Sequence, residues 1–251
     1  MQRYFAKEKF TVIAGPCAVE TEEQCLLIAT FVKQHGAHIF RGGAFKPRSS
    51  PFSFQGLGIN GLHILKKIDS FIPVITEVTQ INYASEIADN VSLLQVGTRN
   101  MHNTELLKAV GQLSKPIVLK RGYSALIEEE WLLAAKYIEL EGNNQIIMCE
   151  RGIRTFEPYT RNTLDLSAVC AVKELTSYFI IVDPSHATGR PSMIIPLSLA
   201  ALAVGADGII VEVHNNPKEA LCDGHQALTF SQFEDLMKAL KKVAPLFGRY
   251  I

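Results

Sequence analysis

The sequence predicts a single-domain (β/α)8 TIM barrel, and three observations carry this prediction. Short apolar runs rich in β-branched residues recur eight times along the chain. Segments with helical spacing separate these runs, so strand and helix alternate throughout. Eight such units in 251 residues leave about 30 residues for each unit, which is the size of one strand–helix repeat in this fold.

The expected strands are apolar over nearly their whole length, as strands covered on both faces by helices should be. In chain order they are residues 11–14 (TVIA), 37–41 (AHIFR), 73–76 (PVIT), 92–96 (SLLQV), 116–119 (PIVL), 145–148 (QIIM), 178–182 (YFIIV) and 208–211 (GIIV).

The expected helices show apolar residues at helical spacing, and several begin at a Ser, Thr or Pro that favours a helix start. An open doubly wound sheet is the alternative arrangement of the same units. No Gly-x-Gly-x-x-Gly follows the first strand, and Gly15-Pro16-Cys17 does not replace it, because proline lacks an amide donor. We therefore prefer the closed barrel. The clearest helices are residues 21–34, 124–140, 191–203 and 231–243.

Composition argues against several classes of partner. Lys and Arg total 25, as do Asp and Glu, so no net charge attracts nucleic acid or an anionic membrane. The apolar stretch 194–206 is too short for a spanning helix, and residues 1–10 lack the apolar core of a signal peptide. The five cysteines are odd in number and irregularly spaced, which favours reduced thiols. We expect a cytoplasmic protein that binds neither nucleic acid nor membrane.

Polar side chains stand at the ends of the expected strands, where barrels of this kind carry their chemistry. Taken singly, each cation is equally well explained as a solvated loop residue. Taken together, cations from four strands would meet at one mouth, which favours a ligand with two anionic groups. The residues at these positions are Cys17, Arg41, Glu77, Arg99, Lys120, Arg151, His186 and Glu212, with Lys46 and Arg48 in the second loop.

Cys17, His186, Glu212 and Asp223 lie at or just after the first, seventh and eighth strands, which are neighbours once the barrel closes. A thiolate, an imidazole and two carboxylates form a mixed ligand set for one divalent ion, namely manganese, iron, cobalt or zinc. Spacing alone leaves a plainer interpretation open, in which Cys17 is core packing and Asp223 belongs to a turn. His214 is a further candidate, because it points to the same side of an extended strand as Glu212.

A series of short motifs follows along the chain in a fixed order. They are GPC at 15–17, RGGAFKPRS at 41–49, SFQG at 53–56, GTRN at 97–100, LKRG at 119–122, ERG at 150–152, DPSH at 183–186 and EVH at 212–214. In these motifs the chain resembles the 3-deoxy-D-arabino-heptulosonate 7-phosphate (DAHP) synthase family. The resemblance is to the catalytic core of the short microbial subtype (type I beta-like), and it runs from about residue 10 to residue 240.

The resemblance implies the condensation of phosphoenolpyruvate with D-erythrose 4-phosphate, the first step of the shikimate pathway to aromatic amino acids. It also implies one divalent metal ion, with manganese favoured, and a homodimer or homotetramer. The family's metal ligands fall on Cys17, His186, Glu212 and Asp223, its phosphoenolpyruvate contacts on Arg41, Lys46, Arg99, Lys120 and Arg151, and its erythrose 4-phosphate segment on Lys46, Pro47, Arg48 and Ser49.

Catalytic roles are expected for Lys46, Cys17 and His186. Protons would be moved by Lys46 or by a water molecule on the metal, because a lysine among other cations should have its pKa lowered toward neutrality. Two departures from the family pattern, Tyr123 and His225, are expected to contact no residue with an assigned role.

A sister family uses arabinose 5-phosphate and typically has Lys-Ala-Asn-Arg-Ser in the second loop. This chain has Lys46-Pro47-Arg48-Ser49 there, so erythrose 4-phosphate is the expected acceptor. The DAHP synthase family often carries a regulatory domain or a fused chorismate mutase domain, whereas the first strand expected here begins about ten residues from Met1. We expect residues 1–251 to form one catalytic barrel without a separate regulatory domain.

Two other classes of function stay open at this point. A barrel that only binds phosphorylated metabolites would keep the cations yet have no need of Cys17 or Asp223, so their joint presence argues against it. A Schiff-base lyase would use Lys120 as its amine nucleophile, and borohydride trapping with substrate would reveal it.

Overall fold

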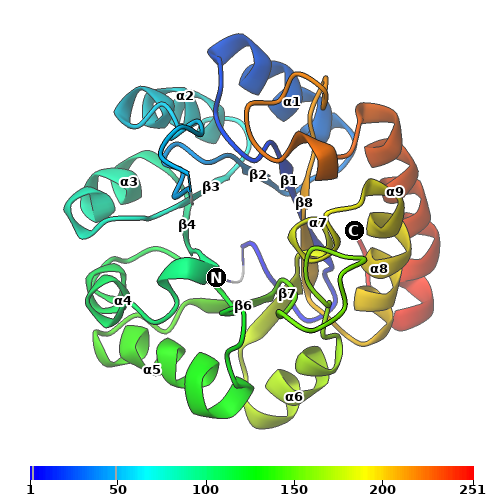
Figure 1. Cartoon of the computed structure of the whole chain (residues 1–251). Coiled ribbons are helices and arrows are strands. Elements are labelled where there is room, and N and C mark those ends of the chain that lie inside the picture. Colours follow the sequence, from blue (N-terminus) through cyan, green and yellow to red (C-terminus); the bar gives the residue numbers. More distant parts are fainter. Residues whose placement is uncertain (2, 49) are drawn as a thin grey trace.

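The computed structural model describes residues 1, 3–48 and 50–251. Eight parallel strands form a closed barrel in sequence order, surrounded by helices (Figure 1). The predicted fold is therefore confirmed, with each strand displaced by no more than two residues at either end. The strands are β1 (Thr11–Gly15), β2 (Ile39–Arg41), β3 (Val74–Glu77), β4 (Leu93–Val96), β5 (Ile117–Lys120), β6 (Ile146–Glu150), β7 (Phe179–Val182) and β8 (Gly208–Glu212).

The long helices cover the outer face of the barrel, and short helical turns stand at several loop ends. The segment expected as one helix over 124–140 begins instead with a π-helical turn, η3 (Ile127–Leu132), which is followed by α5 (Leu133–Leu140). The other α-helices are α1 (Glu22–Gln34), α2 (Ile59–Asp69), α3 (Ala84–Asn90), α4 (Thr104–Gly111), α6 (Ser167–Leu175), α7 (Pro184–Thr188), α8 (Pro191–Ala203) and α9 (Phe230–Val243). The 3-10 turns are η1 (Ile81–Tyr83), η2 (Thr98–Asn100), η4 (Gly224–Gln226) and η5 (Ala244–Phe247).

Barrel closure depends on the pairing of the first strand with the last. β1 and β8 pair in parallel, from Thr11 opposite Gly208 to Gly15 opposite Glu212. A Cβ at Gly208 would lie 2.2 Å from the carbonyl oxygen of Thr11, so only glycine permits this approach. The pairing brings Cys17, just beyond β1, to the same end of the barrel as Glu212.

The interior of the barrel is filled with apolar side chains toward its amino-terminal end. All eight strands contribute to this inner core, for example through Ile13 of β1 and Ile210 of β8. Phe5, which is fully buried, reaches the same core from the segment before β1, and its ring centroid lies 5.7 Å from that of Phe179. Figure 1 shows the chain's amino terminus near the centre of the barrel. Space for a ligand is therefore left at the opposite, carboxyl-terminal end of the strands.

A larger core lies between the sheet and the helices, with Trp131 and Phe233 among its fully buried side chains. All five cysteines are free thiols. Within the described residues, no helix has both the length and the apolar character needed to cross a membrane.

Candidate active site

A cavity of about 270 Å³ opens at the carboxyl ends of the strands, and basic side chains dominate its lining. This size admits small metabolites. Each described residue that was predicted to contact phosphoenolpyruvate or erythrose 4-phosphate lines the cavity, whereas Ser49 lies outside the described residues. The basic side chains of the lining are Arg41, Lys46, Arg48, Arg99, Lys120, Arg151 and Arg161.

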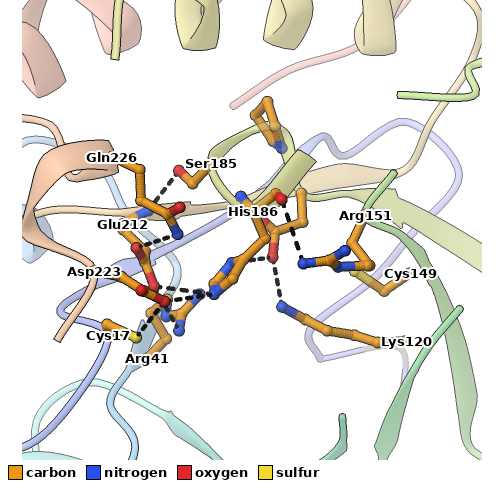
Figure 2. Close-up of polar contacts among 12 residues, drawn as sticks. Cys17, Arg41, Lys120, Cys149, Arg151, Ser185, His186, Glu212, Asp223 and Gln226 are labelled. Carbon is orange, nitrogen blue, oxygen red and sulfur yellow. Dashed lines mark hydrogen bonds and ion pairs between the residues drawn. The ribbon is translucent and has the colours of Figure 1, made fainter. Parts of the chain in front are cut away.

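The four predicted metal ligands meet beside this cavity. Cys17, His186, Glu212 and Asp223 each offer one ligand atom, and these atoms lie within 4.8 Å of one another. Figure 2 shows the four side chains together, with Lys120 and Arg151 on the other side of His186. Closure of β1 against β8 brings Cys17 and Glu212 together, while helix α7 after β7 supplies His186 and the loop after β8 supplies Asp223.

The contacts of His186 leave two electron-rich atoms facing each other. Its Nδ1 lies 2.8 Å from Asp183 Oδ2, an acceptor, which assigns the proton to Nδ1 and leaves a lone pair on Nε2. That Nε2 lies 3.2 Å from Glu212 Oε1. Burial lowers the pKa of His186 to about 4, so at neutral pH the imidazole carries no second proton to place between them.

Glu212 has a buried carboxylate oxygen that lacks a hydrogen-bond donor among the described residues. Its Oε1 is also 3.3 Å from Arg41 Nη2, but it accepts no hydrogen bond within the described part of the chain. Burial, followed by the charge of Cys17, raises the pKa of Glu212 to about 7. A buried carboxylate oxygen without a donor is costly, and a cation between Glu212 and His186 would remove that cost. The donor set therefore fits a bound metal ion.

Asp223 completes the ligand group from a strained position. Its φ of 51° lies in the left-handed region, which aspartate tolerates better than most residues. Burial raises its pKa, but Arg161 and His186 outweigh that effect and lower it well below the usual range. Asp223 is therefore a carboxylate at neutral pH.

Asp183 connects the ligand group to the cationic side of the cavity. It is fully buried, accepts a hydrogen bond from the backbone N–H of His186 at 2.9 Å, and pairs with Lys120 Nζ at 2.5 Å. Asp183 belongs to the DPSH motif at 183–186, but no role was predicted for it. The signal was present, because Asp183 is the N-cap of α7 and an N-cap carboxylate faces the residue three positions later.

Arg161 and Gln226 hold the two carboxylate ligands in place, and neither residue was predicted from the sequence. Arg161 Nη1 donates to Asp223 Oδ2 at 3.3 Å and to Gln226 Oε1 at 2.9 Å. The other end of that amide, Nε2 of Gln226, donates to Glu212 Oε2 at 2.8 Å. Together they fix both carboxylates, and nothing in their sequence spacing indicates this.

The expected lowering of the pKa of Lys46 is wrong. Burial does lower it, but the negative charges of Cys17 and Cys222 outweigh burial and raise the pKa above its ordinary value. Lys46 Nζ donates to the carbonyl oxygen of Cys17 at 3.0 Å and to its Sγ at 3.1 Å. These contacts favour the ammonium form of Lys46.

The expectations for His214 and Tyr123 also change. His214 does not join the ligand group, because its Nε2 lies 3.6 Å from Glu20 Oε2 and its Nδ1 accepts a hydrogen bond from the backbone N–H of Asn216. Tyr123 was expected to contact no residue with a role, yet its ring centroid lies 4.9 Å from the guanidinium carbon of Arg151.

Cys17 and Cys222 are predicted to form a disulfide when metal-free protein meets a thiol oxidant. Their sulfur atoms lie 3.2 Å apart. Treatment with diamide, which is reduced to the hydrazine as two thiols become one disulfide, should leave three of the five thiols titratable after denaturation. The Cys222→Ser protein should keep all four of its thiols. Finding five titratable thiols in the treated unsubstituted protein would contradict the prediction.

Comparison with known proteins identifies relatives over nearly the whole chain. Residues 6–247 match the sequence model of the DAHP synthetase I family. A phospho-2-dehydro-3-deoxyheptonate aldolase of Thermotoga maritima is 49% identical over 241 residues, which cover 95% of this chain and 71% of the relative. A 2-dehydro-3-deoxyphosphooctonate aldolase of Acidithiobacillus ferrooxidans is 31% identical over 254 residues, which cover 93% of this chain and 89% of the relative.

Two solved structures share this fold closely. The crystal structure of the Thermotoga maritima phospho-2-dehydro-3-deoxyheptonate aldolase (DAHP synthase) has a TM-score of 0.95 and 48% identity, with 98% of this chain and 72% of that chain covered. A truncated form of the 3-deoxy-D-arabino-heptulosonate 7-phosphate synthase from the same organism has a TM-score of 0.92 and 46% identity, with 98% of this chain and 91% of that chain covered. The fold, the match over residues 6–247 and these relatives show that the chain belongs to the DAHP synthetase I family.

Proposed function

We propose that the cavity at the mouth of the barrel carries out the family's reaction, with the metal ligands and the basic residues of its lining in separate roles. Membership of the family makes the chain a 3-deoxy-7-phosphoheptulonate synthase, acting at the first step of the shikimate pathway. The observation that carries the proposed roles is the position of the four-ligand group at the edge of a cavity lined by arginines and lysines. One part can bind a metal, and the other can bind two anionic substrates.

Cys17, His186, Glu212 and Asp223 would hold one divalent metal ion. Manganese is favoured over iron, cobalt and zinc because two of the four ligands are carboxylates. A divalent ion bound there supplies Lewis acidity toward a carbonyl oxygen. The buried Glu212 Oε1, which has no hydrogen-bond partner among the described residues, lies 3.2 Å from His186 Nε2, and this arrangement supports the assignment.

Phosphoenolpyruvate would bind through the cations of four strands. Arg99, Lys120 and Arg151 would hold its phosphate, while Arg41 and Lys46 would face its carboxylate. Arg41 supports this role because its Nε and Nη1 are buried and have no hydrogen-bond partner within the described residues, so an anion would satisfy them. The raised pKa of Lys46 supports a role as a fixed positive charge.

Erythrose 4-phosphate would bind through the second loop. Lys46, Pro47 and Arg48 line the cavity, and Ser49 follows them in the sequence. A lysine and an arginine in one loop suit a terminal phosphate, since the arginine supplies paired donors and the lysine a compact charge. This arrangement would place the aldehyde end of the sugar toward the ligand group.

The chemistry then requires positioning and charge stabilisation. Carbon 3 of phosphoenolpyruvate attacks the aldehyde carbon, the new carbon–carbon bond forms, and the electron pair of the carbonyl double bond moves to its oxygen. Water adds at carbon 2 and gives up one proton, which the new alkoxide takes to become a hydroxyl. The hydroxyl at carbon 2 then becomes the ketone as the carbon–oxygen bond to phosphate breaks, and its proton leaves with inorganic phosphate. Arg99, Lys120 and Arg151 would stabilise the negative charge on the departing phosphate. Lys120 is engaged in its ion pair with Asp183, which argues against the Schiff-base alternative.

Phosphate release from phosphoenolpyruvate tests the proposed acceptor. With manganese present, we expect release with erythrose 4-phosphate and none above background with arabinose 5-phosphate or after metal stripping. The 2-dehydro-3-deoxyphosphooctonate aldolases at 31% identity make the second sugar the necessary comparison. Release with arabinose 5-phosphate would move the chain to the sister activity, and no release with either sugar would favour a barrel that only binds.

Three further properties stay predictions. We expect a homodimer or homotetramer, a cytoplasmic location, and no regulatory domain among residues 1–251. Light scattering checks the first of these. Turnover that does not respond to added aromatic amino acids would support the last.

A further inference from the structure

We infer that Tyr123 is a positioning residue for phosphoenolpyruvate, because its ring holds the guanidinium of Arg151 in the cavity. Tyr123 follows β5, Arg151 follows β6, and both line the cavity. The guanidinium carbon of Arg151 lies 4.9 Å from the centroid of the Tyr123 ring. This inference rests on the proposed role of Arg151 in binding the substrate phosphate.

The other contacts of Arg151 are too weak to fix its side chain. The residue is 3% exposed, and its hydrogen bonds go to the carbonyl oxygens of His186 at 3.3 Å and Gly152 at 3.5 Å. Both distances are at the long end for a hydrogen bond. Burial lowers the pKa of Arg151, as expected for a guanidinium without a paired carboxylate. The aromatic ring is therefore the partner that defines where this cation lies.

A cation–π contact suits an arginine that must bind an anion. The five N–H groups of a guanidinium are its hydrogen-bond donors, and an attraction of its charge to a ring consumes none of them. A carboxylate partner would use those donors and neutralise the charge. The ring of Tyr123 restrains Arg151 while its N–H groups and its charge stay directed at a phosphate.

The Tyr123 ring is itself held from the neighbouring loop. Arg154 donates its backbone N–H to the carbonyl oxygen of Tyr123 at 2.7 Å, and its guanidinium carbon lies 4.9 Å from the same ring centroid. Arg121, which follows β5, pairs with Glu150 at the end of β6 at 3.0 Å and with Asp165 in the loop after β6 at 2.8 Å. The ring therefore occupies a fixed position between the loops after β5 and β6.

The test compares two substitutions with a matched control. Tyr123→Leu removes the ring and should raise the KM for phosphoenolpyruvate about five- to thirtyfold, the value of a partly to fully desolvated cation–π contact. The KM for erythrose 4-phosphate should change less than twofold. Tyr123→Phe keeps the ring and should raise the KM for phosphoenolpyruvate less than threefold. Tyr159→Leu is the control, because the guanidinium carbon of Arg190 lies 3.9 Å from the centroid of the Tyr159 ring but neither residue lines this cavity.

A direct binding measurement separates this inference from the proposed function. Phosphoenolpyruvate alone should perturb the tyrosine absorption of the unsubstituted protein, and Tyr123→Phe should remove that difference spectrum. In an Arg151→Met background, which has no cation to contact the ring, adding Tyr123→Leu should change the dissociation constant for phosphoenolpyruvate less than twofold. Trp131, the one tryptophan of the sequence, reports by its fluorescence that each variant is folded.

Each result decides one claim. If the unsubstituted protein does not bind phosphoenolpyruvate, the proposed function fails. If it binds, three results overturn the role of Tyr123: an unchanged KM in Tyr123→Leu, equal rises in both KM values, or an equal rise in Tyr123→Leu and Tyr123→Phe. Should Tyr123→Leu not fold, a difference spectrum that persists in Tyr123→Phe overturns it instead.

Discussion

Cys17→Ala is expected to lower kcat by at least about a thousandfold, and no divalent ion should restore it. The substitution removes the thiolate from a group whose ligand atoms lie within 4.8 Å of one another. A loss of three decades corresponds to about 4 kcal/mol of transition-state stabilisation, which is the scale of a Lewis-acid contribution. The measurement is phosphate release by metal-stripped protein after addition of manganese, iron, cobalt or zinc.

The comparison needs the unsubstituted protein and a thiol control. Chelator should abolish turnover of the unsubstituted protein, and manganese should restore it. Cys170→Ala removes an exposed cysteine on α6, and this variant should likewise lose turnover with chelator and regain it with manganese. Metal analysis after gel filtration gives a second readout, in which Cys17→Ala should retain less metal than either. Full activity after exhaustive chelation would falsify the metal hypothesis.

The barrel was predictable because its signal is local and repeated. Each strand is a short apolar run, such as residues 179–182, and β1 to β8 follow one another around the barrel in sequence order. The π-helical turn η3 was not predictable, because the apolar spacing over 124–140 resembles that of an ordinary helix.

The site was predictable where a residue stands at a strand end or in a motif. Cys17, Arg41 and Glu212 reach the mouth because parallel strands present their carboxyl ends at one face. Contacts between distant loops were not predictable. The pKa of Lys46 depends on Cys222, which comes 176 residues later in the numbering and reaches Lys46 only through the fold. The contact between the Tyr123 ring and the Arg151 guanidinium likewise depends on how two loops meet.

Asp183→Asn is expected to weaken metal binding and to lower the free energy of unfolding. Asp183 contacts the ligand His186 at 2.8 Å and the cavity cation Lys120 at 2.5 Å, and all three are largely buried. A carboxylate accepts the Nδ1 proton of His186, whereas an amide can donate to Nδ1 and so leave the proton on Nε2, where it blocks metal ligation. Metal affinity should therefore fall about 10- to 100-fold.

The same substitution leaves the Lys120 ammonium buried without its counter-charge, and breaking a buried pair on one side costs about 3–5 kcal/mol of unfolding free energy. Asp207→Asn is the matched control. Asp207 is 2% exposed and pairs with Lys173 at 2.9 Å and Arg249 at 3.3 Å, and it does not line the cavity. Both variants should lose stability in denaturant titrations, but only Asp183→Asn should lose metal affinity by calorimetry. Equal metal affinity in the two variants would show that Asp183 acts on stability alone, and not on the tautomer of His186.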